Sequence, residues 1–211
     1  CVISQDQGVD EFLQHINVSR ETLDKLKAYA QLLVQWQGKI NLVGPSTLPF
    51  IWRRHFLDSA QLILCPGLNA KDPRVILDIG SGAGFPGLIL GLLTPHHVHL
   101  VESDQRKSSF LRAAVRTLDL RSQITIHNER LEDLEPFKAD IITARAFAPL
   151  SKILQMGSKF AHMETIWLLL KGQDVDQELT DAAISMNMLS NRYPSLTNTQ
   201  GVILELRGGD Q

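Results

Sequence analysis

The sequence has few cysteines and no long apolar run. Only two of its 211 residues, Cys1 and Cys65, are cysteines, so neither a disulfide framework nor a cysteine-ligated metal centre is indicated. The apolar run LILGLL at 88–93 is too short to cross a bilayer. The first residues, CVISQDQGVDEF, lack a basic segment followed by an apolar one, so we expect no secretory signal. We therefore expect a cytoplasmic protein without a membrane partner.

The sequence also lacks an excess of positive charge. It carries 21 basic and 23 acidic side chains, which gives a formal net charge of −2. A protein that coats nucleic acid non-specifically is clearly basic, so this balance argues against such a coat. Any contact with RNA or DNA must then come from a local basic surface.

Hydrophobic residues make up 44% of the chain, which is enough for one well-packed core. Periodic apolar residues predict helices over 19–37 and 47–64. The segment 65–73, CPGLNAKDP, is rich in turn residues and predicts a linker. We therefore predict a helical N-terminal extension over 1–70 and a second domain over 71–211.

From residue 74 onward, short apolar runs alternate with amphipathic segments. The runs predict strands at 74–80, 97–103, 124–128, 139–145 and 165–172, with two more within 190–207. The segments between them predict helices at 85–93, 104–120, 148–160 and about 174–188. This alternation is typical of a doubly wound α/β fold, with a mostly parallel sheet of seven strands and helices on both faces.

Glycines crowd the stretch LDIGSGAGFPG at 77–87, directly after the first predicted strand. Gly80, Gly82 and Gly84 lie on the predicted strand-to-helix turn, where the missing Cβ atoms let a ligand approach backbone N–H groups. Glu102 ends the next strand, where a carboxylate can accept hydrogen bonds from both ribose hydroxyls of a nucleoside. The turn and Glu102 together indicate a nucleoside-containing cofactor, although the glycines alone also fit a tight turn without a ligand.

Two cofactor classes fit this pattern. The spacing Gly82-x-Gly84-x-x-Gly87 matches a dinucleotide fingerprint, so an NAD-dependent oxidoreductase is one alternative. With Asp78 the pattern becomes Asp-x-Gly-x-Gly-x-Gly, which resembles motif I of the class I S-adenosylmethionine-dependent methyltransferases. That resemblance implies that the amino-acid part of the cofactor lies over the turn and that Glu102 holds its ribose.

Further polar residues follow the other predicted strands. Leu131 and Glu132 follow the third strand, Arg145 follows the fourth, and Lys171 ends the fifth. Ligands of doubly wound sheets bind at the carboxyl ends of the strands, so we expect these residues on the same rim as the glycines. In methyltransferases the positions of Leu131 and Glu132 usually contact the adenine. Taken singly, Glu132 is also explained by solvation, and Arg145 by pairing with a carboxylate.

A longer resemblance runs from about residue 20 to the end. The segments INLVG, RRHFLDSAQL, ILDIGSGAGFPGL, VESDQRKSSFLR, ARAFAPL and LLLKGQ occur in this order. Together they resemble the bacterial glucose-inhibited division protein B family, also called RsmG, which methylates N7 of a guanine in the decoding region of 16S ribosomal RNA. The resemblance implies a class I, Rossmann-like fold, S-adenosylmethionine as cofactor, and 16S rRNA or the small ribosomal subunit as partner.

The resemblance also implies a set of site residues. Cofactor contacts are expected at Gly80, Gly82, Gly84, Phe85, Glu102, Leu131, Glu132 and Arg145. Arg145 is in addition the candidate catalytic residue. Glu102 stands where the family often has Asp, which keeps the carboxylate, and Ala144 stands where Ser is common. Phe147 is a candidate for stacking on the guanine and equally for core packing.

Methylation at N7 requires little acid–base chemistry. Guanine N7 has a lone pair and no proton, so no general base, catalytic His or catalytic Cys is expected, and alignment alone can lower the barrier by roughly 7–11 kcal/mol. The sequence lacks the Asn/Asp-Pro-Pro-aromatic motif of exocyclic amine methyltransferases, and neither cysteine follows a proline, which disfavours covalent attack on cytosine. No metal site is expected. The alternatives are methylation of a small molecule or protein, and a non-catalytic nucleotide-binding regulator.

Cations for RNA contacts occur in two predicted helices: Arg53, Arg54 and His55 in one, and Arg106, Lys107, Arg112 and Arg116 in the other. Such groups give salt-dependent contacts with phosphate. A solvated helix face is the simpler explanation for Arg112 and Arg116, and it explains Arg53, Arg54 and His55 as well as RNA contact does. Arg54 is also spaced to pair with Asp58 at i,i+4. We expect the chain to be a monomer.

Overall fold

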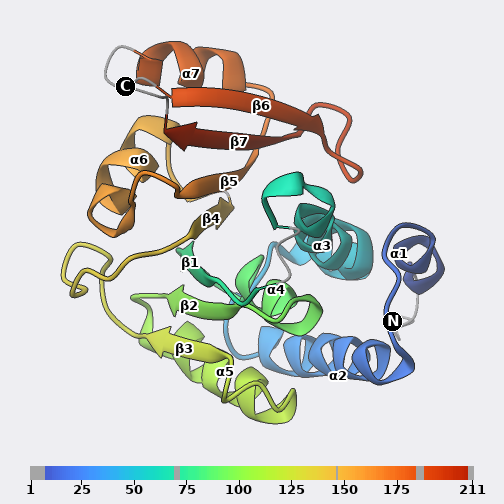
Figure 1. The fold of residues 1–211 in the computed structure, drawn as a ribbon. Coiled ribbons are helices and arrows are strands. Elements are labelled where there is room, and N and C mark those ends of the chain that lie inside the picture. Colours follow the sequence, from blue (N-terminus) through green and yellow to red (C-terminus); the bar gives the residue numbers. More distant parts are fainter. Residues whose placement is uncertain (1–7, 69–71, 146, 184–187, 209–211) are drawn as a thin grey trace.

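One seven-stranded sheet forms the centre of the computed structural model, which describes residues 8–68, 72–145, 147–183 and 188–208 (Figure 1). The strands are β1 (Val75–Ile79), β2 (His97–Val101), β3 (Ile124–His127), β4 (Ile141–Arg145), β5 (Ile166–Lys171), β6 (Met188–Pro194) and β7 (Val202–Gly208). Their order is β3-β2-β1-β4-β5-β7-β6. The predicted sheet is confirmed, with strand ends shifted by one or two residues.

The sheet has a parallel part and an antiparallel edge. The first five strands pair in parallel, while β7 runs antiparallel to β5 and β6 antiparallel to β7. The chain moves from β1 outward through β2 to β3 and then returns to β4 on the other side of β1. This reversal places a topological switch point between β1 and β4, where the carboxyl ends of the strands leave room for a ligand.

Helices cover both faces of the sheet. α2 (Arg20–Gln37), α4 (Gly87–Leu93) and α5 (Gln105–Thr117) contribute to one hydrophobic cluster, and α6 (Leu150–Gly157) and α7 (Val175–Ala183) to a second (Figure 1). Neighbouring side chains of β1 divide between the two, since Ile76 belongs to the first cluster and Leu77 to the second. This division follows from the alternation of side chains along a strand.

The N-terminal segment is more irregular than the predicted helix over 47–64. It contains the 3-10 helix η1 (Pro45–Phe50), the π-helix η2 (Trp52–Leu57), the α-helical turn α3 (Asp58–Ala60) and the 3-10 helices η3 (Gln61–Leu64) and η4 (Pro66–Leu68). Pro45 and Pro49 lack backbone N–H groups, so an α-helical hydrogen-bond ladder is interrupted there. Two further short helices, α1 (Val9–His15) and η5 (Ser158–Phe160), complete the described elements.

The N-terminal segment packs against the glycine-rich turn. Tyr29 of α2 is fully buried and stacks on Phe56 and Phe85, with ring centroids 5.2 and 5.4 Å apart. Its hydroxyl donates a hydrogen bond to the carbonyl oxygen of Ala83 in the turn. One core cluster therefore contains residues from both sides of the predicted boundary near residue 70, and the division into two domains stays a prediction. No helix in the described part of the chain is long and apolar enough to cross a membrane.

Candidate active site

The turn between β1 and α4 adopts a backbone that favours glycine. Gly80 and Gly84 have φ angles of +68° and +93°, in the left-handed region that residues with a side chain rarely adopt. A Cβ at Gly84 would also lie 2.4 Å from Leu88 Cδ1 and 2.7 Å from Tyr29 Oη. The sequence therefore needs glycine here for close packing as well as for the turn.

Asp78, at the end of β1, fixes this turn from its buried side. Its side chain is fully buried, and it accepts hydrogen bonds from Thr143 Oγ1 of β4 at 2.9 Å and from the N–H of Gly87 at 3.2 Å. Burial raises its pKa to about 6. Asp78 thus joins β1, β4 and the start of α4.

A cavity of about 390 Å³ opens on the β2 side of the turn, and we call it the β2-side cavity. Its lining includes six of the predicted site residues, which are Gly80, Gly82, Glu102, Leu131, Glu132 and Arg145. These residues lie in or directly after four different strands, as predicted from the carboxyl-end rule. Leu131 is buried and Glu132 is exposed, so the two present an apolar and a charged surface.

Glu102 is held by backbone groups at the end of β2. Its Oε2 accepts a hydrogen bond from the N–H of Gly82 at 2.9 Å, and its Oε1 accepts one from the N–H of Asp104 at 2.8 Å. The residue is only 8% exposed. The carboxylate is therefore fixed between the turn and the start of α5, facing the β2-side cavity.

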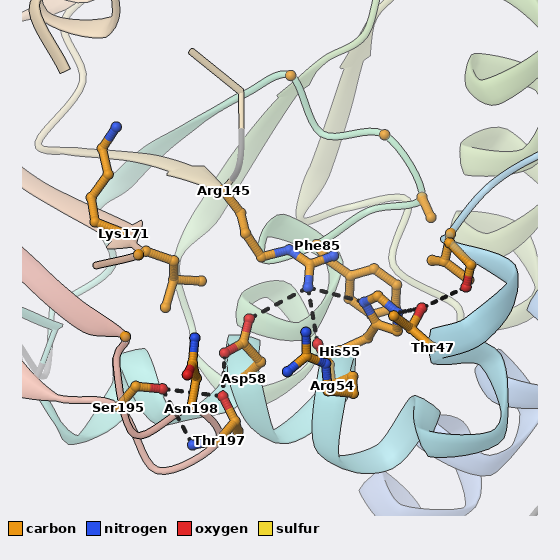
Figure 2. A pocket seen from close by; sticks show the side chains of 18 of the residues that line it. Thr47, Arg54, His55, Asp58, Phe85, Arg145, Lys171, Ser195, Thr197 and Asn198 are labelled. Atoms are coloured by element: carbon orange, nitrogen blue, oxygen red, sulfur yellow. Dashed lines mark hydrogen bonds and ion pairs between the residues drawn. The ribbon is translucent and has the colours of Figure 1, made fainter. Parts of the chain in front are cut away.

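A second cavity of about 430 Å³ lies on the other side of the turn, and we call it the β5-side cavity (Figure 2). Its walls come from the segment 42–58, the glycine turn, the ends of β4 and β5, and the loop between β6 and β7. Gly80, Gly82 and Arg145 line both cavities. The two cavities therefore meet at the turn and at one guanidinium group.

Arg145 is held at one nitrogen by the N-terminal segment. Its Nη1 donates hydrogen bonds to His55 Nδ1 at 3.0 Å and to the Arg54 carbonyl oxygen at 3.2 Å, and it lies 3.4 Å from Asp58 Oδ2 (Figure 2). The guanidinium carbon lies 5.0 Å from the centroid of the Phe85 ring, in the geometry of a cation–π contact. These contacts set the plane and position of the guanidinium at the junction of the two cavities.

His55 was a candidate both for a cationic RNA contact and for a solvated helix face, and the structure favours neither. The residue is only 7% exposed, and burial together with the charges of Arg145 and Arg54 lowers its pKa to about 3. Thr47 Oγ1 donates to the Gly44 carbonyl oxygen, so His55 Nε2–H donates to Thr47 Oγ1 at 2.7 Å. This network assigns the neutral tautomer in which Nδ1 accepts from Arg145.

Comparison with known proteins agrees with this geometry. The family model described as rRNA small subunit methyltransferase G matches residues 22–206. The chain belongs to this family. It is 47% identical over 202 residues to the Ribosomal RNA small subunit methyltransferase G of Paramagnetospirillum magneticum, covering 95% of each chain. It is 48% identical over 197 residues to the protein of the same name from Rhodospirillum rubrum, covering 93% of this chain and 96% of the other.

Solved structures show the same fold at low sequence identity. A methyltransferase described as putative and S-adenosyl-L-methionine-dependent, from Methanococcus maripaludis, has a TM-score of 0.62 at 12% identity over 93% of this chain and 97% of the other. A SAM-dependent methyltransferase from Aquifex aeolicus has a TM-score of 0.58 at 15% identity over 78% and 94%. The predicted class I, Rossmann-like fold and the resemblance to the family are both confirmed. As a member of the methyltransferase G family, the chain is an enzyme that transfers methyl groups.

In this methyltransferase the adjacent residues Arg53 and Arg54 have different surroundings. Arg53 forms an ion pair with Glu11 of α1 and donates to the Leu196 carbonyl oxygen at 3.3 Å. Arg54 is exposed and lines the β5-side cavity. Among the described ion pairs, Asp58 pairs with Arg145 and not with Arg54, which corrects the expected i,i+4 pair. Of the two arginines, only Arg54 borders a cavity of the site.

The basic residues of α5 are also separated by the fold. Lys107 lines the β2-side cavity, whereas Arg106 donates to the Lys39 carbonyl oxygen at 2.5 Å. Arg112 and Arg116 are exposed on the helix, which agrees with a solvated face. The helix begins after Asp104, which caps it: its Oδ1 accepts from the N–H groups of Arg106 and Lys107 at 2.8 and 2.9 Å.

Four other predicted residues lie in the turn or beside the two cavities. Phe85 is buried beneath Arg145 and lines the β5-side cavity, while Gly84 packs against Leu88 and Tyr29 and lines neither cavity. Phe147 lies on the turn, because a Cβ at Gly80 would be 2.2 Å from its Cδ2 atom. It lines the β2-side cavity at 39% exposure, so its proposed stacking on a base stays a prediction. Lys171 pairs with Glu178 at 2.6 Å and also lines the β5-side cavity.

Sequence reasoning missed the role of Asp58 and the loop between β6 and β7. Thr197 and Asn198 of this loop line the β5-side cavity beside Asp58. Thr197 Oγ1 donates to Asp58 Oδ1 at 2.5 Å, although the two residues are 139 positions apart. No spacing in the sequence indicates a contact at this separation. The only signal was that Asp58 belongs to the segment RRHFLDSAQL, which supports the family resemblance.

Three further histidines lie together on neighbouring strands, and the described cysteine is buried. His99 Nδ1 and His127 Nε2 lie 2.9 Å apart, and His97 Nε2 lies 2.9 Å from Thr125 Oγ1. The described residues contain no group of three or more His, Cys, Asp or Glu side chains placed to hold a metal ion. Cys65 is a buried free thiol whose pKa is raised to about 12 by burial and by the charge of Glu205. It lines neither of the two cavities.

Proposed function

We propose that this chain transfers a methyl group from S-adenosylmethionine to N7 of a guanine in 16S ribosomal RNA. The observation that carries the proposal is the meeting of two cavities at Gly80, Gly82 and Arg145. A cofactor in one cavity and a base in the other would contact the same three residues. Such a junction is what a direct transfer between two bound molecules requires.

The β2-side cavity suits the nucleoside part of the cofactor. Ile79, Val101 and Leu131 offer apolar surface for the adenine, and the fixed carboxylate of Glu102 offers acceptors for the ribose hydroxyls. We propose that Gly80 and Gly82 carry the amino-acid part and that Glu132 borders the adenine. When bound, S-adenosylmethionine supplies an electrophilic methyl group.

The β5-side cavity suits a base that needs no deprotonation. Guanine N7 attacks through its lone pair, so the protein has to orient the base and exclude water. His55 has both ring nitrogens engaged, by Thr47 and by Arg145, and so it serves to position Arg145. We propose that Arg145 contacts the base directly, as the catalytic residue. This assignment agrees with the expected absence of a general base.

The exposed Arg54 at the edge of the β5-side cavity is our candidate for an RNA phosphate contact. The substrate is the 16S rRNA itself or the small subunit that contains it. We propose that the enzyme acts as a monomer. Because the proposed substrate is part of the ribosome, we also propose that the enzyme acts in the cytoplasm.

The test uses labelled S-adenosylmethionine with 16S rRNA and with small subunits from a strain that lacks this activity. The product is mapped by strand cleavage specific for N7-methylguanine. We expect label at a single guanine in the decoding region. If no label enters either substrate while S-adenosylhomocysteine still raises the melting temperature, the RNA target is wrong and a small-molecule or protein substrate takes its place. NAD serves as the control ligand and should leave the melting temperature unchanged.

A further inference from the structure

An N7 methyltransferase must distinguish guanine from adenine, because both bases carry N7. The two purines differ at the atoms beyond N7. Guanine presents the O6 acceptor next to the N1–H donor, whereas adenine presents the N6 amino donor next to the N1 acceptor. A protein donor placed beside a protein acceptor therefore matches guanine and is mismatched by adenine. The same mismatch would leave polar groups of the pocket unpaired, which is how polar sites reject close analogues.

The β5-side cavity contains one such pair in its wall. Arg145 Nη1 and Asp58 Oδ2 lie 3.4 Å apart, as the dashed line between them shows (Figure 2). Among the described residues that line this cavity, Asp58 is the only acidic one. The side chains of Asp58 and Arg145 are 18% and 19% exposed, so both are largely removed from solvent and still reach the cavity.

Asp58 keeps acceptor capacity on the oxygen that faces Arg145. Its Oδ1 accepts from Thr197 Oγ1 at 2.5 Å and from Gln61 Nε2 at 3.1 Å. Its Oδ2 has only the 3.4 Å contact with Arg145 within the described residues. A charge-assisted N–H···O bond is usually about 2.7–2.9 Å long, so this contact leaves Oδ2 weakly used. A carboxylate oxygen can accept more than one hydrogen bond.

Arg145 has donors left in the same way. Within the described residues, its three hydrogen bonds to the N-terminal segment all come from Nη1. No hydrogen bond to another described residue engages Nη2 or Nε, which leaves these donors for a ligand at the junction of the two cavities. Because the residue stands between the cavities, a base that offers O6 to Arg145 has its neighbouring N7 toward the β2-side cavity.

We propose that Arg145 and Asp58 together read the target guanine: Arg145 donates to O6, and Asp58 Oδ2 accepts from N1–H. Adenine in the same position would set its amino donor against Arg145 and its N1 lone pair against the carboxylate. Asp58 is then the residue that determines specificity, while Thr197 and Gln61 position it through Oδ1. This inference rests on the proposed function and names how that site selects its base.

The first experiment tests the wild-type enzyme with altered substrates. Small subunits are assembled from 16S rRNA that carries guanine, hypoxanthine or 2-aminopurine at the target position. Hypoxanthine keeps O6 and N1–H, so we expect its kcat/KM within about tenfold of guanine. 2-Aminopurine has neither group, so we expect a loss of roughly 100-fold or more. Equal methylation of hypoxanthine and 2-aminopurine would overturn the proposal. Failure to methylate even guanine would instead overturn the proposed function.

The second experiment separates reading from loop anchoring. In Asp58→Asn the amide can turn its donor toward adenine N1, so we expect guanine methylation to fall by about 10- to 100-fold and the preference for guanine over adenine to fall by at least the same factor. The matched control is Thr197→Val, which removes the loop contact but keeps the carboxylate. Because Gln61 Nε2 still donates to Oδ1 in this variant, it should retain the preference for guanine. If both variants lower the rate and both keep the preference, Asp58 only anchors the loop and the inference is wrong.

Discussion

The two cavities beside the glycine turn hold their carboxylates in different ways. In the β2-side cavity, Glu102 accepts hydrogen bonds from the backbone N–H groups of Gly82 and Asp104. In the β5-side cavity, Asp58 is held by the side chains of Thr197, Gln61 and Arg145. Backbone donors are set by the fold itself, whereas side-chain donors depend on residues that another sequence on the same fold can replace.

This difference separates a general part of the molecule from a specific part. The β2-side cavity is built where β1 and β2 end, and any chain with this topology brings those ends together. The β5-side cavity needs the segment 42–58 and the loop 195–201 in addition. Function on a shared fold resides in such added segments. We therefore expect substitutions on the β2 side to change cofactor binding and substitutions on the β5 side to change base selection.

The largest effect should come from Arg145, because it belongs to both sides. Arg145→Lys keeps a positive charge but loses the planar group that contacts His55, Asp58 and Phe85. We expect the single-turnover rate of methyl transfer to fall by about 100- to 1,000-fold, as for loss of a positioned donor at a reacting centre. Circular dichroism and thermal unfolding would verify that the fold is retained. A rate within a few-fold of wild type would remove Arg145 from the reaction.

Glu102→Ala should affect only the β2 side. The variant loses a fixed carboxylate, and we expect the dissociation constant of S-adenosylhomocysteine, measured by calorimetry, to rise by about 10- to 100-fold. The preference for guanine over 2-aminopurine at saturating cofactor should stay at the wild-type value. Asp133→Asn is the matched control, since this carboxylate is exposed and lines neither cavity. An unchanged dissociation constant in Glu102→Ala would exclude Glu102 from the ribose site.

The same difference explains what the sequence could predict. The succession of apolar runs and the glycine pattern at 77–87 are local features of the sequence. They located the glycine turn, Glu102 and the edge of the sheet where Arg145 lies. The base side depends on contacts between distant segments. Asp58 and Thr197 meet across 139 positions, so no local pattern indicates their contact. Long-range contacts of this kind follow from packing and not from propensity.

His55 shows a second limit of local reasoning. Its neighbours Arg53 and Arg54 suggested a basic cluster, yet the ring is buried and neutral. Charge state depends on burial, and here the Phe85 ring stacks on the His55 ring with centroids 5.2 Å apart. The residue types are plain from the sequence, but whether each one is buried or charged is known only from the fold.

The neutral His55 predicts a pH effect that originates on the β5 side. Its pKa is about 3 in the folded chain and about 6.5 when unfolded, so only the unfolded chain binds this proton between pH 7 and pH 5. The free energy of unfolding therefore falls as the pH falls, by about 2 kcal/mol at pH 5 from this residue. Asp78, whose folded pKa is raised to about 6, acts in the opposite direction over the same range.

A variant isolates the contribution of His55 from that of Asp78. In His55→Gln the decrease in unfolding free energy between pH 7 and pH 5 should be smaller than in wild type by about 1–2 kcal/mol. Urea unfolding at the two pH values measures both decreases, and Asp78 contributes equally to each. Equal decreases in the two proteins would show that folding does not lower the pKa of His55.

The smallest effect should come from Tyr29, which supports the turn between the two cavities. Tyr29→Phe keeps the ring stack but leaves the buried Ala83 carbonyl oxygen without the hydroxyl donor, so we expect a loss of about 1–2 kcal/mol in urea unfolding. Tyr193→Phe is the matched control. Its hydroxyl lies 3.4 Å from Glu205 Oε2, a long contact whose loss should cost less than about 0.5 kcal/mol.

Because the turn borders both cavities, Tyr29→Phe should weaken cofactor binding and guanine methylation by similar factors below about tenfold. A change confined to one of them would show that the turn supports only that side.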